Sequence, residues 1–200
     1  PLKGERILQK NIRRGTADLT QGPAMTRQEA ERAVLTGVEI ARDLCAKGVK
    51  LLGTGEMGIG NTTTSSAVAA VFLDKEPVVM TGRGAGLSSE GLQRKIKAIE
   101  TGIAVNKPDP ADPLDVVSKV GGLDLAGLAG VFLGGAMCRV PVLVDGFISS
   151  VAALIAARLC PACKDYMLGS HASDEPASKL VLSELGLEPF LYAGMRLGEG

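Results

Sequence analysis

The chain has 200 residues, of which 46% are hydrophobic, so it can bury a full core, and its length favours one domain of α/β size. Lys and Arg together number 22, as do Asp and Glu, and the basic residues are spread along the chain, which argues against a nucleic-acid surface and against a polybasic membrane patch. Aromatic residues make up only 3% and Trp is absent, so platforms for stacking bases or sugars are not expected.

The longest uncharged apolar stretch, residues 125–138, falls short of the roughly 20 residues that span a bilayer and is expected to be a buried helix. The chain opens without a charged-then-apolar leader, and its four cysteines are too few for a disulfide framework, so we expect a reducing cytoplasm. Only Cys160 and Cys163 have suggestive spacing, and with His171 as the sole histidine a metal or redox role is disfavoured. Because the first residue is Pro1, we expect a piece of a longer protein.

In chain order, the first element is a helix that follows Thr26, which forms a capping box with Glu29; the helix continues through residue 47 and is closed by Gly48. Beyond it, short β-branched runs predict strands, each followed by a Gly, Ser or Asp loop and then a helical stretch. The strands are expected at residues 49–52, 77–80, 140–144 and 166–168, and the helices at 61–72, 89–105, 114–120, 123–137, 147–159 and 175–185.

The strand runs show no polar alternation, which predicts a parallel sheet with helices on both faces, a Rossmann-like three-layer α/β fold. We expect an N-terminal helical segment at residues 1–48 and the α/β domain at 49–200. In such sheets ligands bind beyond the carboxyl ends of the strands. The functional loops are therefore expected to be GTGEMGIGN, TGRGAGLSS, DGFISS and GSHASDEP, together with the final RLGEG.

The first of these loops has the G-x-G-x-x-G spacing of dinucleotide folds, at Gly53, Gly55 and Gly58. A pyrophosphate there would lie beside Glu56, with a repulsion of roughly 4 kcal/mol for charges about 4 Å apart. A helix N-terminus returns only about 0.3–1 kcal/mol. A P-loop is excluded because no Lys follows Gly60. Two interpretations stay open for these residues: a turn that approaches a ligand with a carboxylate in it, or a tight turn with a solvated Glu.

The second loop has the features of a phosphate site. Gly82, Gly84 and Gly86 let backbone amides approach an anion, Ser88 or Ser89 caps the next helix, and Lys95 lies one to two turns inside that helix. A phosphate monoester would fit these groups. The alternative is a flexible turn before an amphipathic basic helix.

Four further residues are candidates. Asp145 follows a predicted strand and either caps the next helix, which its position favours, or holds a ribose diol. Ser173 is a cap or a phosphate ligand, and the neighbouring His171 is a structural residue or a catalyst. Glu199, flanked by glycines, is easily desolvated by a ligand, which would raise its pKa toward that of a general base. Two separated carboxylates over a sugar phosphate indicate chemistry at an anomeric carbon.

Several longer blocks resemble the nicotinate-nucleotide:dimethylbenzimidazole phosphoribosyltransferase family of cobalamin assembly, in order across most of residues 50–200. These blocks are GTGEMGIGNTTTSSAV, GRGAGLSSEGLQRKI, DPLDVVSKVGGLD, RVPVLVDGFISSVAAL, SHASDEP and LGLEPFLYAGMRLGEG. The resemblance implies a parallel α/β sheet with a small helical domain. It also implies transfer of ribose 5-phosphate from nicotinate mononucleotide to 5,6-dimethylbenzimidazole, which gives α-ribazole 5′-phosphate and nicotinate. The enzyme would be a cytoplasmic homodimer with no metal or cofactor and with no nucleic-acid or membrane partner.

The resemblance also implies residue roles. Glu199 is the general base that takes the proton from the attacking base, and Glu56 is the second functional carboxylate. The expected substrate-binding residues are Gly55, Gly58, Gly60, Gly82, Gly84, Lys95, Asp145, Ser173 and Gly198. Members of the family extend further at both ends, and part of their aromatic-base pocket comes from an N-terminal segment that this chain does not include.

Two other functions stay open on the residues alone. One is an NAD(P)-dependent oxidoreductase, which would need an acidic ribose ligand near the end of the second strand. Asp74 and Glu76 instead precede the strand predicted at residues 77–80. The other is a noncatalytic nucleotide-binding module.

Overall fold

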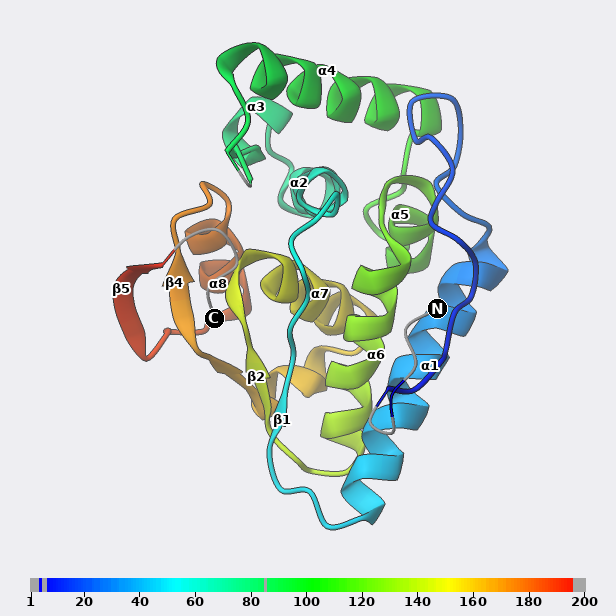
Figure 1. Cartoon of the computed structure of the whole chain (residues 1–200), viewed down its shortest axis with the longest axis vertical. Helices are drawn as coiled ribbons and strands as arrows, with labels where there is room; N and C mark the ends of the chain where they lie inside the picture. The colour runs from blue at the N-terminus through cyan, green and yellow to red at the C-terminus, as the bar shows by residue number, and fades with distance from the viewer. Residues whose placement is uncertain (1–3, 5–6, 85, 196–200) are drawn as a thin grey trace.

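The computed structural model describes residues 4, 7–84 and 86–195 as a parallel sheet flanked by helices (Figure 1). The helices are α1 (Arg27–Ala46), α2 (Thr62–Leu73), α3 (Pro77–Met80), α4 (Ser89–Asn106), α5 (Pro113–Val120), α6 (Leu123–Met137), α7 (Gly146–Leu159), the 3₁₀ helix η1 (Pro161–Tyr166) and α8 (Ser178–Leu185). The strands are β1 (Leu52–Gly53), β2 (Val142–Val144), β3 (Met167–Gly169), β4 (His171–Ser173) and β5 (Leu191–Met195). The expected α/β class is confirmed.

The sheet has the order β1-β2-β3, and both pairings are parallel, as the uninterrupted apolar runs predict. Leu52 pairs with Val142 and Gly53 with Leu143. β4 and β5 form a separate parallel pair. The strands expected near residues 140–144 and 166–168 are present, with bounds shifted by one or two residues, whereas β1 is shorter than expected and begins only at Leu52.

The strand predicted at residues 77–80 is wrong, because this segment is the helical turn α3. Pro77 occupies the first turn of that helix, where its fixed φ suits helical geometry and its missing N–H is not needed. The next strand in the sheet after β1 is therefore β2, which the chain reaches only after four more helices beyond α2. The short strand–helix–strand unit that a dinucleotide fingerprint requires is not formed around this glycine loop.

Helix α1 begins as its sequence predicts. The Thr26 hydroxyl accepts from the amide of Glu29, whose carboxylate accepts from the amide of Thr26, so the expected capping box is confirmed. Helices α1 and α6 run side by side in the same direction (Figure 1). Their backbones meet at glycines: a Cβ built on Gly130 would overlap the carbonyl oxygen of Val34, and one on Gly37 would overlap that of Gly127. Only residues without a side chain allow this approach.

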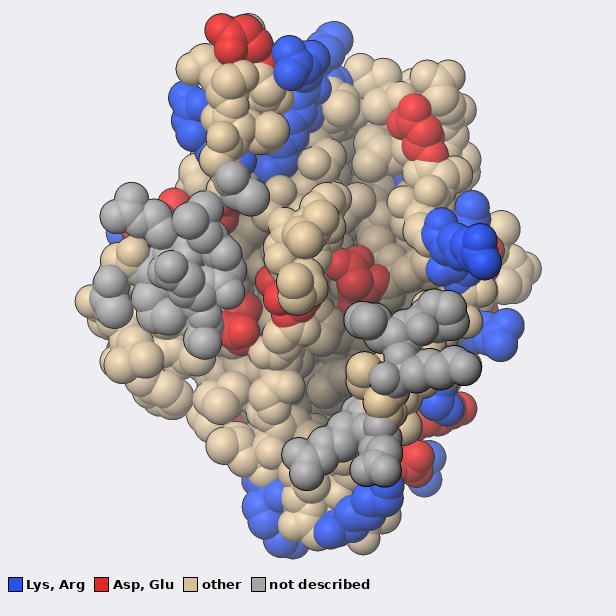
Figure 2. Space-filling view, viewed as in Figure 1, with Lys and Arg blue, Asp and Glu red and all other residues tan. Residues whose placement is uncertain are grey.

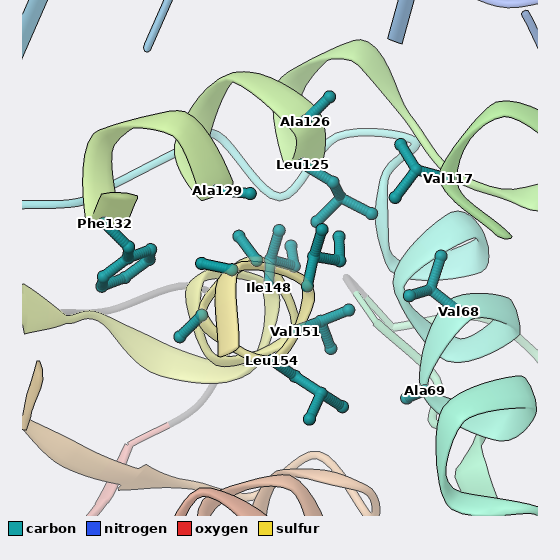
Figure 3. Packing of buried hydrophobic residues seen from close by; sticks show 14 of the residues in the cluster. Val68, Ala69, Val117, Leu125, Ala126, Ala129, Phe132, Ile148, Val151 and Leu154 are labelled. Atoms are coloured by element: carbon teal, nitrogen blue, oxygen red, sulfur yellow. The ribbon is translucent and has the colours of Figure 1, made fainter. Parts of the chain in front are cut away.

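Helix α7 forms the centre of the core and is buried on nearly all sides, as its almost continuous apolar sequence predicts. Ile148, Val151 and Leu154 pack between Leu125 of α6 and Val68 of α2 (Figure 3). Val151 and Leu154 are at most 1% exposed, and burial of each such side chain contributes roughly 1.5–3 kcal/mol. This packing fixes the helix that follows β2, and so fixes the loop at the carboxyl end of that strand.

Among the described residues, no helix combines the length and the apolar character needed to cross a membrane.

Candidate active site

The strand register brings the loop after β1 against the loop after β2. When the pairing of Leu52 with Val142 is continued along both strands, Gly55 comes opposite Asp145. A Cβ on Gly55 would lie 3.7 Å from Oδ2 of Asp145. Asp145 stands at the N-cap position of α7, yet its side chain makes no capping hydrogen bond. The capping role that its position favours is therefore wrong, because the carboxylate turns toward β1 and β4 instead.

On its other side, Asp145 meets the only histidine of the chain. Its Oδ1 lies 3.6 Å from Nδ1 of His171, whose side chain is 5% exposed. The hydroxyl of Ser170 donates to the carbonyl of Val144 at 2.9 Å and so can accept from His171 Nδ1 at 3.0 Å. In that tautomer the imidazole N–H is directed between Ser170 and Asp145, and the histidine acts as a buried support for the carboxylate.

Glu56 belongs to an acidic cluster, which we define as Glu56, Asn61 and Asp124. The side-chain amide of Asn61 donates to Glu56 at 3.0 Å and to Asp124 at 2.8 Å. Glu56 also accepts from the amide of Gly58 within its own turn. Figure 2 shows acidic side chains gathered near the centre of the face that contains the loops after β1 and β2. One amide thus holds two negative charges close together, which favours a ligand with positive charge at this point.

Lys95 is the centre of a second group, the lysine cluster, which we define as Lys95, Thr62, Gly82, Gly84 and Glu175. The ammonium of Lys95 donates to Thr62 Oγ1 at 2.9 Å and to the Gly82 carbonyl at 3.0 Å. Its side chain comes from α4, which Ser88 caps by accepting from the amide of Gly91. Burial lowers the pKa of Lys95, and the charge of Glu175 partly opposes that effect.

Glu175 closes the glycine turn of the lysine cluster. Its Oε1 accepts from the amide of Gly84 at 3.0 Å, and its own amide donates to Ser173 Oγ at 3.3 Å. A Cβ at Gly82 would overlap Glu175 Oε2 and crowd Pro176, so the carboxylate occupies its present position only because residue 82 has no side chain. Ser173 therefore shapes the β4–α8 turn and keeps its hydroxyl hydrogen available to a ligand.

The sequence-predicted residues thus fall into neighbouring groups. Asn61 and Thr62 are consecutive at the start of α2, which joins the acidic cluster to the lysine cluster. His171 and Ser173 lie on β4, which joins Asp145 to Glu175. Gly58 and Gly60 have positive φ values of +70° and +79° and shape the loop between β1 and α2. Glu199 and Gly198, expected to belong to the site, lie outside the described residues.

Sequence reasoning missed four residues of these groups: Asn61, Thr62, Asp124 and Glu175. Their contacts cross the chain, because Asn61 pairs with Asp124 over 63 positions and Gly84 pairs with Glu175 over 91. The available signal was positional, since Asn61 and Thr62 begin a helix directly after a glycine loop. Within residues 4, 7–84 and 86–195, no three His, Cys, Asp or Glu side chains come together as metal ligands would.

A family model described as phosphoribosyltransferase matches residues 2–200. The chain belongs to this family. Over 196 residues, 98% of the chain, it is 56% identical to the nicotinate-nucleotide–dimethylbenzimidazole phosphoribosyltransferase of Acetivibrio thermocellus. Over 194 residues it is 49% identical to the phosphoribosyltransferase of that name from Geobacter metallireducens. The family that the sequence blocks resemble is confirmed.

A solved member of the family has the same architecture. The crystal structure of CobT from Thermus thermophilus matches with a TM-score of 0.93 at 42% identity, over 100% of this chain and 60% of that one. The chain spans 56% of the length of the Acetivibrio phosphoribosyltransferase and 55% of the Geobacter one.

Proposed function

We propose that the protein transfers ribose 5-phosphate from nicotinate mononucleotide to 5,6-dimethylbenzimidazole, giving α-ribazole 5′-phosphate and nicotinate, as a cytoplasmic homodimer. The names of the Acetivibrio and Geobacter relatives support this reaction. The observation that carries it is the meeting of a cationic group and an acidic group at the start of α2, where Thr62 contacts Lys95 and Asn61 contacts Glu56. One end of a sugar phosphate is negative, and its ring becomes positive during transfer.

The lysine cluster is the proposed site for the 5′-phosphate. Lys95 has three N–H donors, and two of them go to Thr62 and Gly82, which leaves the third for a ligand oxygen. The hydroxyl of Ser173 and the amide of Gly84 would add neutral donors. Because Lys95 is already buried, it loses little further hydration when the phosphate arrives.

The ribose and its reacting carbon would then lie toward Asp145 and the acidic cluster. The carboxylate of Asp145 lies beside Gly55 and makes no capping hydrogen bond to α7, so it can accept hydrogen bonds from a ribose diol. The bond from C1′ to nicotinate breaks as the benzimidazole nitrogen bonds to C1′, and nicotinate leaves with the bonding electron pair. Glu56 would stabilise the positive charge that develops on the sugar ring. Attack on the face opposite nicotinate gives the inverted, α-configured product.

Glu199 is the proposed general base, which takes the proton from the benzimidazole as its nitrogen attacks. General-base assistance typically contributes 10²–10⁴-fold. We therefore expect Glu199→Gln to reduce kcat by a factor in that range while nicotinate mononucleotide still binds. Full turnover by this variant would remove Glu199 from the mechanism.

The central experiment incubates the full-length protein with nicotinate mononucleotide and dimethylbenzimidazole and separates the products by chromatography. We expect equal amounts of nicotinate and α-ribazole 5′-phosphate, and neither product when the dimethylbenzimidazole is omitted. Binding of the nucleotide without release of nicotinate would favour the noncatalytic module instead. Sedimentation of the same sample tests the homodimer.

A further inference from the structure

The carboxylate of Glu175 occupies the place where an incoming anion would bind. Its Oε1 accepts the N–H of Gly84 at 3.0 Å, which is one of the amides that the glycine turn offers to a ligand. Its negative charge raises the pKa of Lys95 and so partly offsets the larger lowering by burial. In this state the lysine cluster is therefore already partly neutralised by a group from the chain itself.

The second oxygen of this carboxylate is poorly accommodated. Glu175 Oε2 is buried and has no hydrogen-bond partner, and it lies against the backbone at Gly82. A buried acceptor without a donor is unfavourable, and more so when it is charged. Glu175 can therefore leave the Gly82–Gly84 turn for solvent when an anion that binds this turn more tightly takes its place. Its neighbours Asp174 and Pro176 are exposed, so the segment lies at the surface.

A phosphate monoester and this carboxylate cannot share the cluster. Both require the N–H of Gly84, and two like charges at such a separation repel strongly. A dianionic phosphate brings more charge to Lys95 than the carboxylate does and has enough oxygens for the lysine, Gly84 and Ser173 together. The nucleoside lacks an anionic group on its 5′ position and so brings nothing to this subsite that replaces the carboxylate.

We propose that Glu175 is the internal occupant of the phosphate subsite and is displaced by the 5′-phosphate, so that its charge lowers the affinity for the nucleotide and leaves the affinity for the nucleoside unchanged. This inference rests on the proposed function of the lysine cluster. Glu175 sets the affinity of the phosphate subsite in this scheme and is not a catalytic residue, because it has left the subsite when the nucleotide is bound.

The test measures binding of nicotinate mononucleotide and of its dephosphorylated nucleoside by calorimetry, with the full-length protein and the variants Glu175→Gln and Asp174→Asn. The glutamine keeps the shape and an oxygen acceptor for Gly84 but removes the charge. Asp174→Asn is the matched control, since it removes one negative charge from the neighbouring position. We expect Glu175→Gln to bind the nucleotide at least about tenfold more tightly, with unchanged nucleoside affinity, and Asp174→Asn to stay within about twofold of the unsubstituted protein.

The possible results distinguish a failure of the Glu175 inference from a failure of the proposed function. If the unsubstituted protein and Glu175→Gln bind the nucleotide equally well, or if the variant binds it more weakly, Glu175 supports the turn and the inference is wrong while the phosphate site stands. An equal gain in Asp174→Asn also overturns it, because the effect would then come from overall charge. If none of the proteins binds the nucleotide, the proposed function and the inference both fail.

Discussion

Replacement of Lys95 by Met tests the phosphate site most directly. Methionine keeps most of the buried stem and removes the ammonium, which at present donates to Thr62 and Gly82 and has one N–H left for a ligand. A hydrogen bond to a charged group contributes roughly 1.5–3 kcal/mol, which corresponds to about 10–150-fold in Kd. We place the expected loss of nucleotide affinity toward the upper part of this range, because Lys95 is already desolvated in the free protein.

The assay is calorimetric titration of nicotinate mononucleotide and, separately, of dimethylbenzimidazole. Lys97→Met is the matched control: Lys97 lies on the same helix, its side chain is 77% exposed, and its ion pair with Glu100 is 3.6 Å long. The control should change the nucleotide Kd by less than about twofold. A Lys95→Met variant that melts normally and binds the nucleotide as tightly as the control would refute the assignment of the phosphate to this cluster.

The lowered pKa of Lys95 gives the same prediction a pH signature. Below that pKa the ammonium is charged and binds phosphate. Above it, binding must also take up a proton, so affinity should fall by about tenfold per pH unit, at lower pH than for an ordinary lysine. Lys95→Met should show no such fall over the alkaline range. An identical alkaline slope in both proteins would assign the titration to another group.

Three further predictions concern stability and reactivity. Gly130→Ala places a Cβ against a backbone carbonyl of α1 and should destabilise the fold by about 1–3 kcal/mol or more in chemical denaturation, whereas Gly22→Ala, which meets open space, should not; equal effects would refute the packing argument. Thr26→Ala removes one side of the capping box and should reduce the free energy of unfolding by about 1 kcal/mol, and an unchanged denaturation midpoint would contradict this. In native protein, a thiol reagent should modify exposed Cys160 well before buried Cys163, because burial raises the pKa of the Cys163 thiol to about 12; modification of both at one rate would contradict this.

Helices were predictable wherever local rules decide the structure. The helix expected at residues 123–137 has those same bounds as α6, since its length and apolar content leave no competing choice. Residues 77–80 failed because four residues are too few to show a period, and β-branched composition then outweighed the proline that starts a helical turn.

The sequence was sufficient to predict which loops form the site, but not which of their side chains contact one another. The loops that follow predicted strands indicated Glu56, Lys95 and Asp145, and each of these lies in one of the contact networks described above. The glycine turn before Lys95 follows the helical turn α3, however, and not a strand. The turn of Asp145 away from the helix it precedes depends on His171 and Gly55, which tertiary structure alone brings near. The position of Glu175 against the Gly82–Gly84 turn likewise depends on the hydrogen bond from the amide of Gly84, which lies 91 positions away in the sequence and follows from no local pattern.

The glycine contact between α1 and α6 has a consequence beyond the helices themselves. Each of these helices leads directly into one of two neighbouring strands, α1 into β1 and α6 into β2. The close backbone contact therefore fixes the distance between the two helices whose following strands pair with each other, and Gly55 and Asp145 lie just beyond the far ends of those strands. We therefore expect Gly130→Ala to weaken substrate binding at these loops as well as to destabilise the fold, although residue 130 does not contact them.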